Sequence, residues 1–205
     1  MNTDKKTLSY LALGDSYTIG EDVPQDQRWP VQLASQSNRN GVRISDPRII
    51  ATTGWTTDEL INAINEAGLI DKYDLVSLLI GVNNQYRDYP FDQYVNEFTQ
   101  LLNTAIQFAG NDPSKVFVVS IPDYGVTPFG QKKGQAKISR EIDEYNARAE
   151  LNCKENEVLF INITDISKKA LVDPEMVASD GLHPSGKMYT EWTSRINGKL
   201  ASILK

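Results

Sequence analysis

Three side chains that can cooperate in nucleophilic catalysis occur in two short motifs of this sequence. Ser16 follows an apolar run in "LALGDSYTIG", and His183, the only histidine, lies in "SDGLHPSG" three residues after Asp180. A serine hydroxyl at its ordinary pKa is a poor nucleophile and needs a base beside it. An aspartate that accepts the Nδ1–H of a histidine fixes the tautomer whose Nε2 can take the serine proton. The two motifs therefore predict a nucleophile, a base and an acid that orients the base.

A serine nucleophile that attacks a carbonyl carbon also needs hydrogen-bond donors for the oxygen that becomes negative. Asn83 offers a side-chain amide shortly after the apolar run "LVSLLI", and Gly54 offers a backbone N–H with no side chain in the way. The backbone N–H of Ser16, at an expected helix start, is a third donor. We therefore expect an oxyanion hole formed by Ser16, Gly54 and Asn83.

The elements that must position these residues are short apolar runs that alternate with longer helical patterns, which is typical of βαβ units around a parallel sheet. Strands are expected at 8–13, 44–51, 75–80, 116–121 and 158–161. Helices are expected at 29–38, 57–67, 91–108, 136–156 and 185–200. Ligands bind such sheets outside the carboxyl ends of the strands, which is where the candidate donors and the nucleophile fall.

Aromatic residues near the same strand ends are candidates for lining a substrate cleft. The Gly- and Pro-rich stretch 122–135 is expected to be the longest irregular segment, and its Tyr124 and Phe129 could form an apolar wall for an acyl chain. Trp55 and Tyr86, which follow the second and third strands, could equally stack against sugars.

Three further charged residues near the motifs have alternative interpretations. Asp15 is expected to accept backbone N–H groups around the turn, because the histidine already has an acid in its own loop. Asp165, after the fifth strand, is a rival orienting acid that ranks below Asp180 because it is farther from His183 in sequence. Arg87 either lines the cleft or belongs to a solvated rim.

Composition excludes several functional classes. Lysine and arginine number 21 and aspartate and glutamate 27, and the resulting net charge of −6 argues against nucleic acid as a partner. A single cysteine, Cys153, excludes an internal disulfide, and one histidine with no Cys-rich spacing predicts no metal site. The sequence contains no run of 18 apolar residues, so no membrane span is predicted. We expect one domain over 1–205 with a charged leader at 1–6, located in the cytoplasm, or periplasmic or secreted if a signal peptide was removed.

Four segments of the sequence resemble, in order along the chain, the four sequence blocks of the SGNH hydrolase superfamily, also called GDSL esterases and lipases. They are "GDSYT", Gly54, "GVNN" and "DGLHP". The resemblance implies a three-layer α/β/α sandwich with five parallel strands in the flavodoxin-like order 2-1-3-4-5. It also implies Ser16 as nucleophile, His183 as base, Asp180 as orienting acid, and Gly54 and Asn83 as oxyanion donors, with no cofactor. The sequence departs from the family pattern at Asn84, where an aspartate is frequent, and in the threonines that precede Gly54.

The expected activity is hydrolysis of a small-molecule carboxylic ester through an acyl-enzyme at Ser16. The substrate is either a short-acyl ester, such as an O-acetylated carbohydrate, or a single-chain lipid or thioester. Two alternatives remain open at this point. An acyltransferase of the same fold would use the same residues, whereas a non-catalytic binding module would have no reason to keep them.

Overall fold

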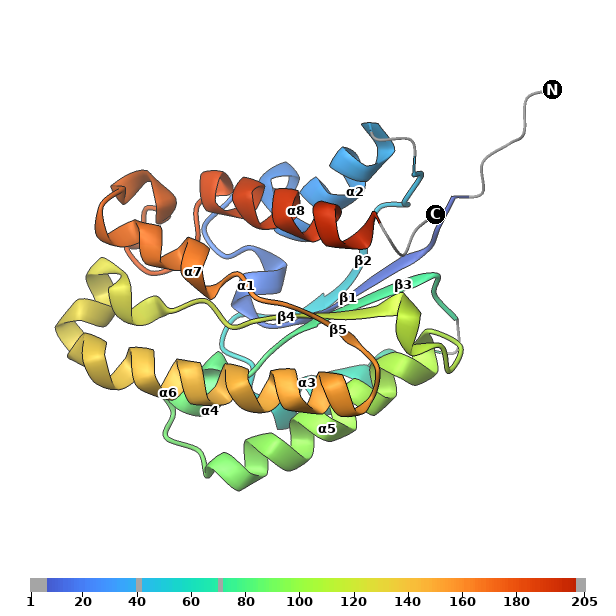
Figure 1. The fold of residues 1–205 in the computed structure, drawn as a ribbon, viewed down its shortest axis with the longest axis horizontal. Coiled ribbons are helices and arrows are strands. Elements are labelled where there is room, and N and C mark those ends of the chain that lie inside the picture. Colours follow the sequence, from blue (N-terminus) through green and yellow to red (C-terminus); the bar gives the residue numbers. More distant parts are fainter. Residues whose placement is uncertain (1–6, 40–41, 70–71, 202–205) are drawn as a thin grey trace.

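The computed structural model describes residues 7–39, 42–69 and 72–201, and in this part of the chain five strands form one parallel sheet (Figure 1). The charged leader expected at 1–6 lies outside the described residues. The strands are β1 (Tyr10–Gly14), β2 (Arg48–Ala51), β3 (Leu75–Leu79), β4 (Val116–Val119) and β5 (Leu159–Ile161). Their order is β2-β1-β3-β4-β5, and every neighbouring pair is parallel, which confirms the predicted topology.

Helices cover both faces of the sheet and complete the three layers. The long helices are α2 (Trp29–Arg39), α3 (Thr57–Ala67), α5 (Phe91–Phe108), α6 (Pro128–Glu155) and α8 (Gly186–Leu200). Figure 1 shows α2 and α8 on one face and α3, α5 and α6 on the other. The short helices are α1 (Ser16–Ile19), α4 (Val82–Tyr86) and α7 (Thr164–Ser167). Each short helix follows a strand, so its first residues lie at the carboxyl edge of the sheet.

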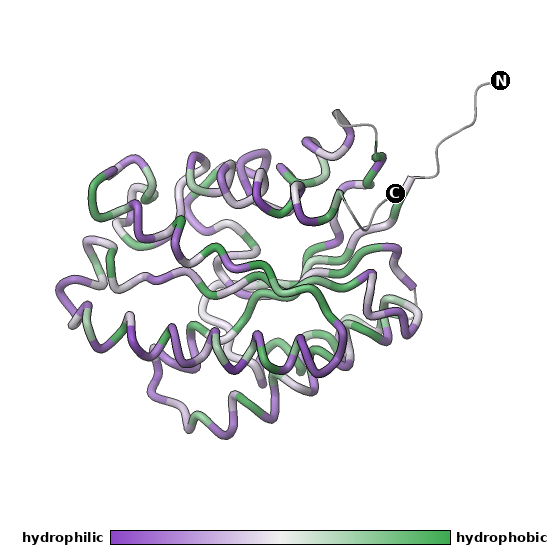
Figure 2. Tube along the Cα trace, in the orientation of Figure 1, coloured by the Kyte–Doolittle hydropathy of each residue, from purple (hydrophilic) through white to green (hydrophobic). Residues whose placement is uncertain are grey.

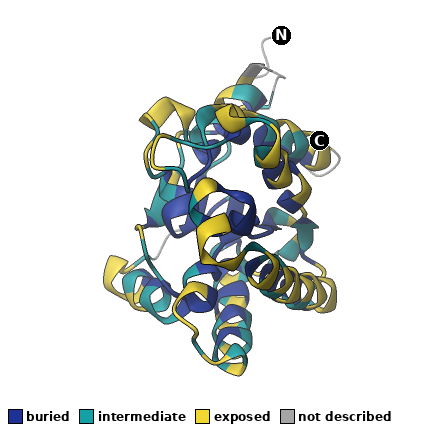
Figure 3. Ribbon diagram, turned by 90° about the vertical axis from the view of Figure 1, so that its left-hand side faces the viewer, coloured by how far each residue is buried: buried dark blue, intermediate teal, exposed yellow. Residues whose placement is uncertain are grey.

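Regularly spaced apolar residues explain how the helices pack on both faces of the sheet. Figure 2 shows the sheet as the most hydrophobic part of the chain, and Figure 3 shows buried residues in the interior with the outer helix faces exposed. In α5, Tyr94, Phe98, Leu101 and Leu102 recur at helical spacing and are all buried against the sheet layer. No helix of the described ranges is long and apolar enough to cross a membrane.

The prediction of an irregular segment over 122–135 is wrong for its second half. After a turn of 3₁₀ helix at Tyr124–Val126, α6 begins at Pro128, where a proline at the first helical position costs no hydrogen bond. Thr127 caps the helix by accepting the Gly130 N–H at 3.1 Å. Gly134 has a φ of 107° and bends α6. The glycines and prolines of this stretch thus mark a cap and a kink.

The second expected strand is also shorter than predicted. Only Arg48–Ala51 pairs with β1 as a ladder, and Ile44 makes an isolated bridge to Leu8. Pro47 has no N–H to donate, so the ladder cannot extend back through it.

Close backbone packing at the end of β1 requires a glycine at position 14. Gly14 lies opposite Ala51 of β2 and Leu79 of β3. A Cβ there would lie 2.5 Å from the carbonyl oxygen of Leu79 and 2.2 Å from Oγ1 of Thr18. The backbone oxygen cannot move away without disturbing the β1–β3 pairing, so only glycine lets the chain turn into α1 at this point.

Replacing this glycine should therefore destabilise the sheet. We expect Gly14→Ala to lower the free energy of unfolding by about 1–3 kcal/mol, as overpacking in a well-packed core does. The matched control is Gly198→Ala in α8, where a Cβ meets nothing within 4 Å and where alanine should stabilise the helix by up to about 1 kcal/mol. Urea unfolding of both variants measures the difference, and equal effects would contradict the steric explanation.

Candidate active site

The predicted nucleophile Ser16 begins α1, immediately after the end of β1. Asp15 is the N-cap of this helix, and its Oδ1 accepts the backbone N–H of Tyr17 at 3.0 Å. Gly20, with a φ of 72°, ends the helix after a single turn. Ser16 is 4% exposed, so it lies at the carboxyl edge of the sheet, below the outer surface.

The loop before α8 holds the predicted base and its acid in direct contact. Nδ1 of His183 lies 2.5 Å from Oδ2 of Asp180. The other carboxylate oxygen, Oδ1, accepts the backbone N–H groups of Leu182 and His183 at 2.8 and 2.9 Å. Partial burial alone would raise the pKa of Asp180, but the hydrogen bonds from His183 and the backbone outweigh it and lower the pKa. The carboxylate is therefore charged at neutral pH. Because it binds Nδ1 of the imidazole, Nε2 is the ring nitrogen left to contact another group.

The segment after α1 is bound directly to this loop. Oδ2 of Asp22 accepts the Oγ–H of Ser179 at 2.7 Å and the backbone N–H of Asp180 at 2.9 Å. The ring of Tyr17 meets the ring of His183 edge-on, with centroids 5.8 Å apart. These contacts hold together two segments that are more than 150 residues apart in sequence.

The two other predicted oxyanion donors follow β2 and β3. Gly54 lies in the turn before α3 and has a φ of 88°, a conformation in which glycine is the least strained residue. Asn83 is in the first turn of α4, and its Nδ2 donates to the carbonyl oxygen of Trp55 at 2.9 Å. One N–H of the Asn83 amide is thereby used to orient the side chain, and its second N–H remains for another acceptor.

Asn84, the departure from the family pattern, is buried and joins α4 to the start of α3. Its Oδ1 accepts the backbone N–H of Thr57 at 3.1 Å, and its Nδ2 donates to Oγ1 of Thr57 at 2.7 Å. An amide supplies both an acceptor and a donor here. The contact fixes the position of α4 and hence of the neighbouring Asn83.

A pocket of about 300 Å³ brings the predicted catalytic groups together. Ser16, Gly54, Asn83 and His183 all line it. The remaining lining residues are mainly apolar or aromatic: Tyr17, Thr53, Val82, Tyr86, Tyr124, Phe129 and Leu182. The arrangement can hold a carbonyl group between a serine hydroxyl and hydrogen-bond donors, with an imidazole alongside.

Three of the four aromatic candidates, Tyr86, Tyr124 and Phe129, lie in the wall of this pocket. Trp55 is not among the residues that line it: its partly buried side chain packs against the hydrophobic core, and its carbonyl group accepts a hydrogen bond from Asn83. The hydroxyl of Tyr124 donates to Oε1 of Gln85 at 2.8 Å, so the polar end of this side chain has a partner within the protein.

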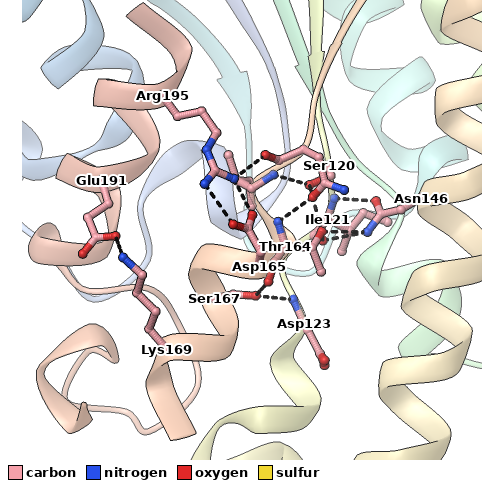
Figure 4. A network of polar contacts seen from close by, with 12 residues as sticks. Ser120, Ile121, Asp123, Asn146, Thr164, Asp165, Ser167, Lys169, Glu191 and Arg195 are labelled. Carbon is pink, nitrogen blue, oxygen red and sulfur yellow. Dashed lines mark hydrogen bonds and ion pairs between the residues drawn. The ribbon is translucent and has the colours of Figure 1, made fainter. Parts of the chain in front are cut away.

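Asp165, the rival orienting acid, is paired with an arginine. Figure 4 shows the guanidinium of Arg195 in α8 against both carboxylate oxygens of Asp165, with Nη2 at 2.9 Å from Oδ2. The hydrogen bond from Arg195 lowers the pKa of Asp165. The acid that contacts His183 is Asp180.

Some pocket residues were not singled out from sequence. Tyr17, Val82 and Leu182 are part of the motifs "GDSYT", "GVNN" and "DGLHP", so their positions beside the reactive groups were the available signal. Asp22 had no such signal, because its contact with the histidine loop exists only in the folded chain. Within the described ranges no three His, Cys, Asp or Glu side chains are grouped in a way that could hold a metal ion.

Comparisons with known proteins identify a family and similar folds. A model of the GDSL-like Lipase/Acylhydrolase family matches residues 12–190. Similar solved structures include TesA (TM-score 0.75, 15% identity, covering 95% of this chain and 99% of that one). The esterase EstA from Pseudoalteromonas sp. has a TM-score of 0.70 at 15% identity, covering 96% and 98%. Axe2, an acetylxylan esterase from Geobacillus stearothermophilus, has a TM-score of 0.70 at 18% identity, covering 98% and 96%. No curated protein matches the chain by sequence.

The buried carboxyl next to Ser16 should make stability depend on pH. Burial raises the pKa of Asp15 to about 7, and among the described residues its Oδ2 has no hydrogen-bond partner. A folded-state pKa above the unfolded one means that folding takes up a proton, so the contribution of Asp15 to stability falls as pH rises from about 4 to about 7. Asp15→Asn keeps the acceptor for Tyr17 without the charge. Its free energy of unfolding relative to the wild type should rise by about 1–4 kcal/mol over this interval.

Asp165→Asn is the control with the opposite sign, because its pKa is lowered in the folded state. Its relative stability should improve as pH falls. Urea unfolding at a series of pH values measures both variants, and a pH-independent difference for Asp15→Asn would contradict the assignment.

Proposed function

The chain belongs to the GDSL-like lipase/acylhydrolase family and is a carboxylic ester hydrolase, and on that premise we propose that Ser16 is its nucleophile, His183 its general base and Asp180 the acid that orients the base. The observation that carries the proposal is that Ser16 and His183 line one pocket while Asp180 holds Nδ1 of the same imidazole. A serine hydroxyl needs an oriented base near it to be activated, and the shared pocket supports that role for His183.

The chemistry proceeds through an acyl-enzyme. Nε2 of His183 takes the proton of the Ser16 hydroxyl as Oγ bonds to the ester carbonyl carbon, and the electron pair of the C=O bond moves to the oxygen. When the tetrahedral intermediate collapses, the C–O bond to the alcohol breaks and the imidazolium protonates the departing oxygen. A water molecule then gives a proton to His183 as its oxygen bonds to the acyl carbon, which forms a second tetrahedral intermediate. When this collapses, the bond from carbon to Oγ breaks and the imidazolium returns the proton to Oγ, which releases the carboxylic acid and restores the serine.

The negative oxygen of both intermediates is stabilised by the backbone N–H groups of Ser16 and Gly54 and by the free amide N–H of Asn83. Donors of this kind are effective because they are already oriented when the charge forms, and loss of one typically costs about 10²–10³ in kcat. The bond from Asn83 to the Trp55 carbonyl supports this role, because it orients the amide before substrate arrives.

The pocket favours a substrate with a single apolar acyl chain over an acetylated carbohydrate. Its wall is formed by Val82, Tyr86, Tyr124, Phe129 and Leu182, none of which carries a charge. A sugar would need convergent hydrogen-bonding groups. Of the two residues proposed for stacking on a sugar, Tyr86 lines the pocket and Trp55 does not. A volume of about 300 Å³ is at the small end of ligand sites, which suits one chain of medium length. Hydrolysis and acyl transfer share all of these residues, and hydrolysis is proposed because it needs no acceptor other than water.

The triad assignment predicts a graded set of losses. Ser16→Ala should abolish labelling by a fluorophosphonate probe, and both Ser16→Ala and His183→Ala should lower kcat by at least about 10⁴-fold. Asp180→Asn should lower kcat by about 10²–10⁴-fold, because the amide no longer holds the correct histidine tautomer.

Asp165→Asn provides the matched control and should leave kcat unchanged, since that carboxylate binds Arg195. Initial rates with p-nitrophenyl butyrate measure all four variants. Wild-type turnover in Ser16→Ala or His183→Ala would refute the assignment. So would equal losses in the two aspartate variants.

The acyl pocket predicts a preference in chain length. Among p-nitrophenyl esters, kcat/KM should rise from acetate to a maximum at about six to ten carbons, as apolar area is buried in the transition state. Phe129→Ala should lower kcat/KM for octanoate by about tenfold or more while changing that for acetate much less. Leu171→Ala, at an exposed position outside the pocket, is the control. A profile that falls steeply beyond butyrate would favour deacetylation instead.

A further inference from the structure

Of the two interpretations of Arg87, the solvated rim agrees with its exposed side chain, and the guanidinium also binds the backbone of the loop that carries Gly54. Nη2 donates to the carbonyl oxygen of Gly54 at 2.6 Å. Nη1 lies 3.3 Å from Oε1 of Glu59 in the first turn of α3. Arg87 is not among the residues that line the pocket. We call these two contacts the arginine bridge.

The loop that the bridge holds is an exposed turn in which Arg87 is the only side chain that forms a hydrogen bond with Gly54 among the described residues. Its neighbours have other contacts: the Thr53 hydroxyl donates to Glu21, and the Trp55 carbonyl oxygen accepts from Asn83. Thr52 and Thr53 are exposed, and Gly54 and Trp55 are only partly buried. Glycine has the widest choice of backbone angles, and Gly54 adopts a φ of 88°. A bond to its carbonyl oxygen restricts rotation of the peptide group that follows, and so helps to hold the direction in which the Gly54 N–H points.

The other end of Arg87 is part of the helix that carries Asn83. Arg87 caps the carboxyl end of α4, and its backbone N–H donates to the carbonyl oxygen of Asn83 at 3.0 Å. One residue therefore contacts both Gly54, through its side chain, and Asn83, through its backbone. Arg87 thus adds a second link between the two proposed oxyanion donors, beside the bond from Asn83 to the Trp55 carbonyl oxygen, and it is the one that acts on Gly54 itself.

Glu59 gives the bridge a fixed anchor. Its Oε2 accepts the backbone N–H of Thr56 at 2.9 Å and the Thr56 hydroxyl at 3.1 Å, which ties the carboxylate to the start of α3. Partial burial alone would raise the pKa of Glu59, but the hydrogen bonds from Thr56 and Arg87 and the positive charge of Arg87 outweigh it and lower the pKa. The carboxylate thus stays charged and holds the guanidinium in one orientation.

We propose that Arg87 is a positioning residue for ester hydrolysis, which fixes Gly54 relative to Asn83 so that both donors point at the oxyanion. The inference rests on the proposed function, because it requires those two residues to be the donors. An exposed ion pair contributes little to stability, and both side chains here are 39% exposed. The bridge is therefore expected to act on the transition state far more than on folding.

The test compares Arg87→Ala and Arg87→Lys with Lys115→Ala, which removes a partly exposed cation that pairs with Asp112 just before β4, at the edge of the sheet opposite the pocket. We expect Arg87→Ala to lower kcat for p-nitrophenyl butyrate by about 10–100-fold with KM changed by less than about threefold, because a misplaced donor costs somewhat less than a missing one. Lysine keeps one donor for Gly54, so Arg87→Lys should be intermediate. Lys115→Ala should match the wild type.

A transition-state analogue separates positioning from a general structural effect. A trifluoromethyl ketone with a butyl chain accepts Ser16 Oγ at its carbonyl carbon, while the serine proton moves to His183 and the ketone oxygen becomes negative. Its inhibition constant should rise in Arg87→Ala by about the same factor as kcat/KM falls. The Tm should change by less than about 2 °C, and millimolar methylguanidinium should restore part of the activity.

The possible outcomes test the positioning role of Arg87 and the proposed function separately. If Arg87→Ala keeps both kcat and the inhibition constant within about twofold of the wild type, the positioning role is wrong, while an inactive Ser16→Ala still supports the proposed function. A large fall in Tm of both Arg87 variants, without rescue by methylguanidinium, would make the bridge a folding contact and also overturn the inference. A wild type that neither hydrolyses the ester nor reacts with the fluorophosphonate would overturn the proposed function, and the inference with it.

Discussion

The parallel pairing of β1 between β2 and β3 is the constraint on which the site depends. Gly14 lies opposite both Ala51 and Leu79, so the three strands end at one level. The segments that leave them carry Ser16, Gly54 and Asn83, and all three residues line one pocket. Parallel strands have their carboxyl ends at the same edge of the sheet, so a nucleophile and donors that are distant in sequence become neighbours. The close approach at Gly14 is the local condition for this arrangement.

Beyond the sheet edge, polar side chains add to apolar packing in holding the reactive segments in place. Asp15 caps the turn that carries the serine, and Asp180 binds both the backbone and the ring of His183. Asp22 joins those two segments, and Arg87 does the same for the glycine loop and the asparagine helix. Short loops have few apolar contacts, so hydrogen bonds to their backbone groups are the means of ordering them. The loops that carry the proposed reactive groups are accordingly held by side chains that form no covalent bond with the substrate.

Sequence patterns predicted the regular elements best where apolar periodicity was long. The helices over 57–67 and 91–108 have the predicted bounds, because an extended apolar face allows only one way of packing on the sheet. The stretch 122–135 was misjudged because Thr127, Pro128 and Gly134 have the same composition as a loop, although they form a cap, a first helical residue and a kink. Trp55 was expected in the pocket from its position after a strand, but a single residue in a turn has no periodicity from which to infer the direction of its side chain.

The sequence by itself determined the fold class, the strand order through its resemblance to a known family, and the residue types able to do the chemistry. These follow from local patterns and from motifs in which the reactive residue and its neighbours are adjacent in the chain. Tertiary structure alone decided that Asp165 binds Arg195, that Arg87 binds Gly54, and that an apolar wall faces the serine. The reason is physical: a charged or aromatic side chain can reach several partners from one backbone position, and only the packed arrangement of distant segments selects among them.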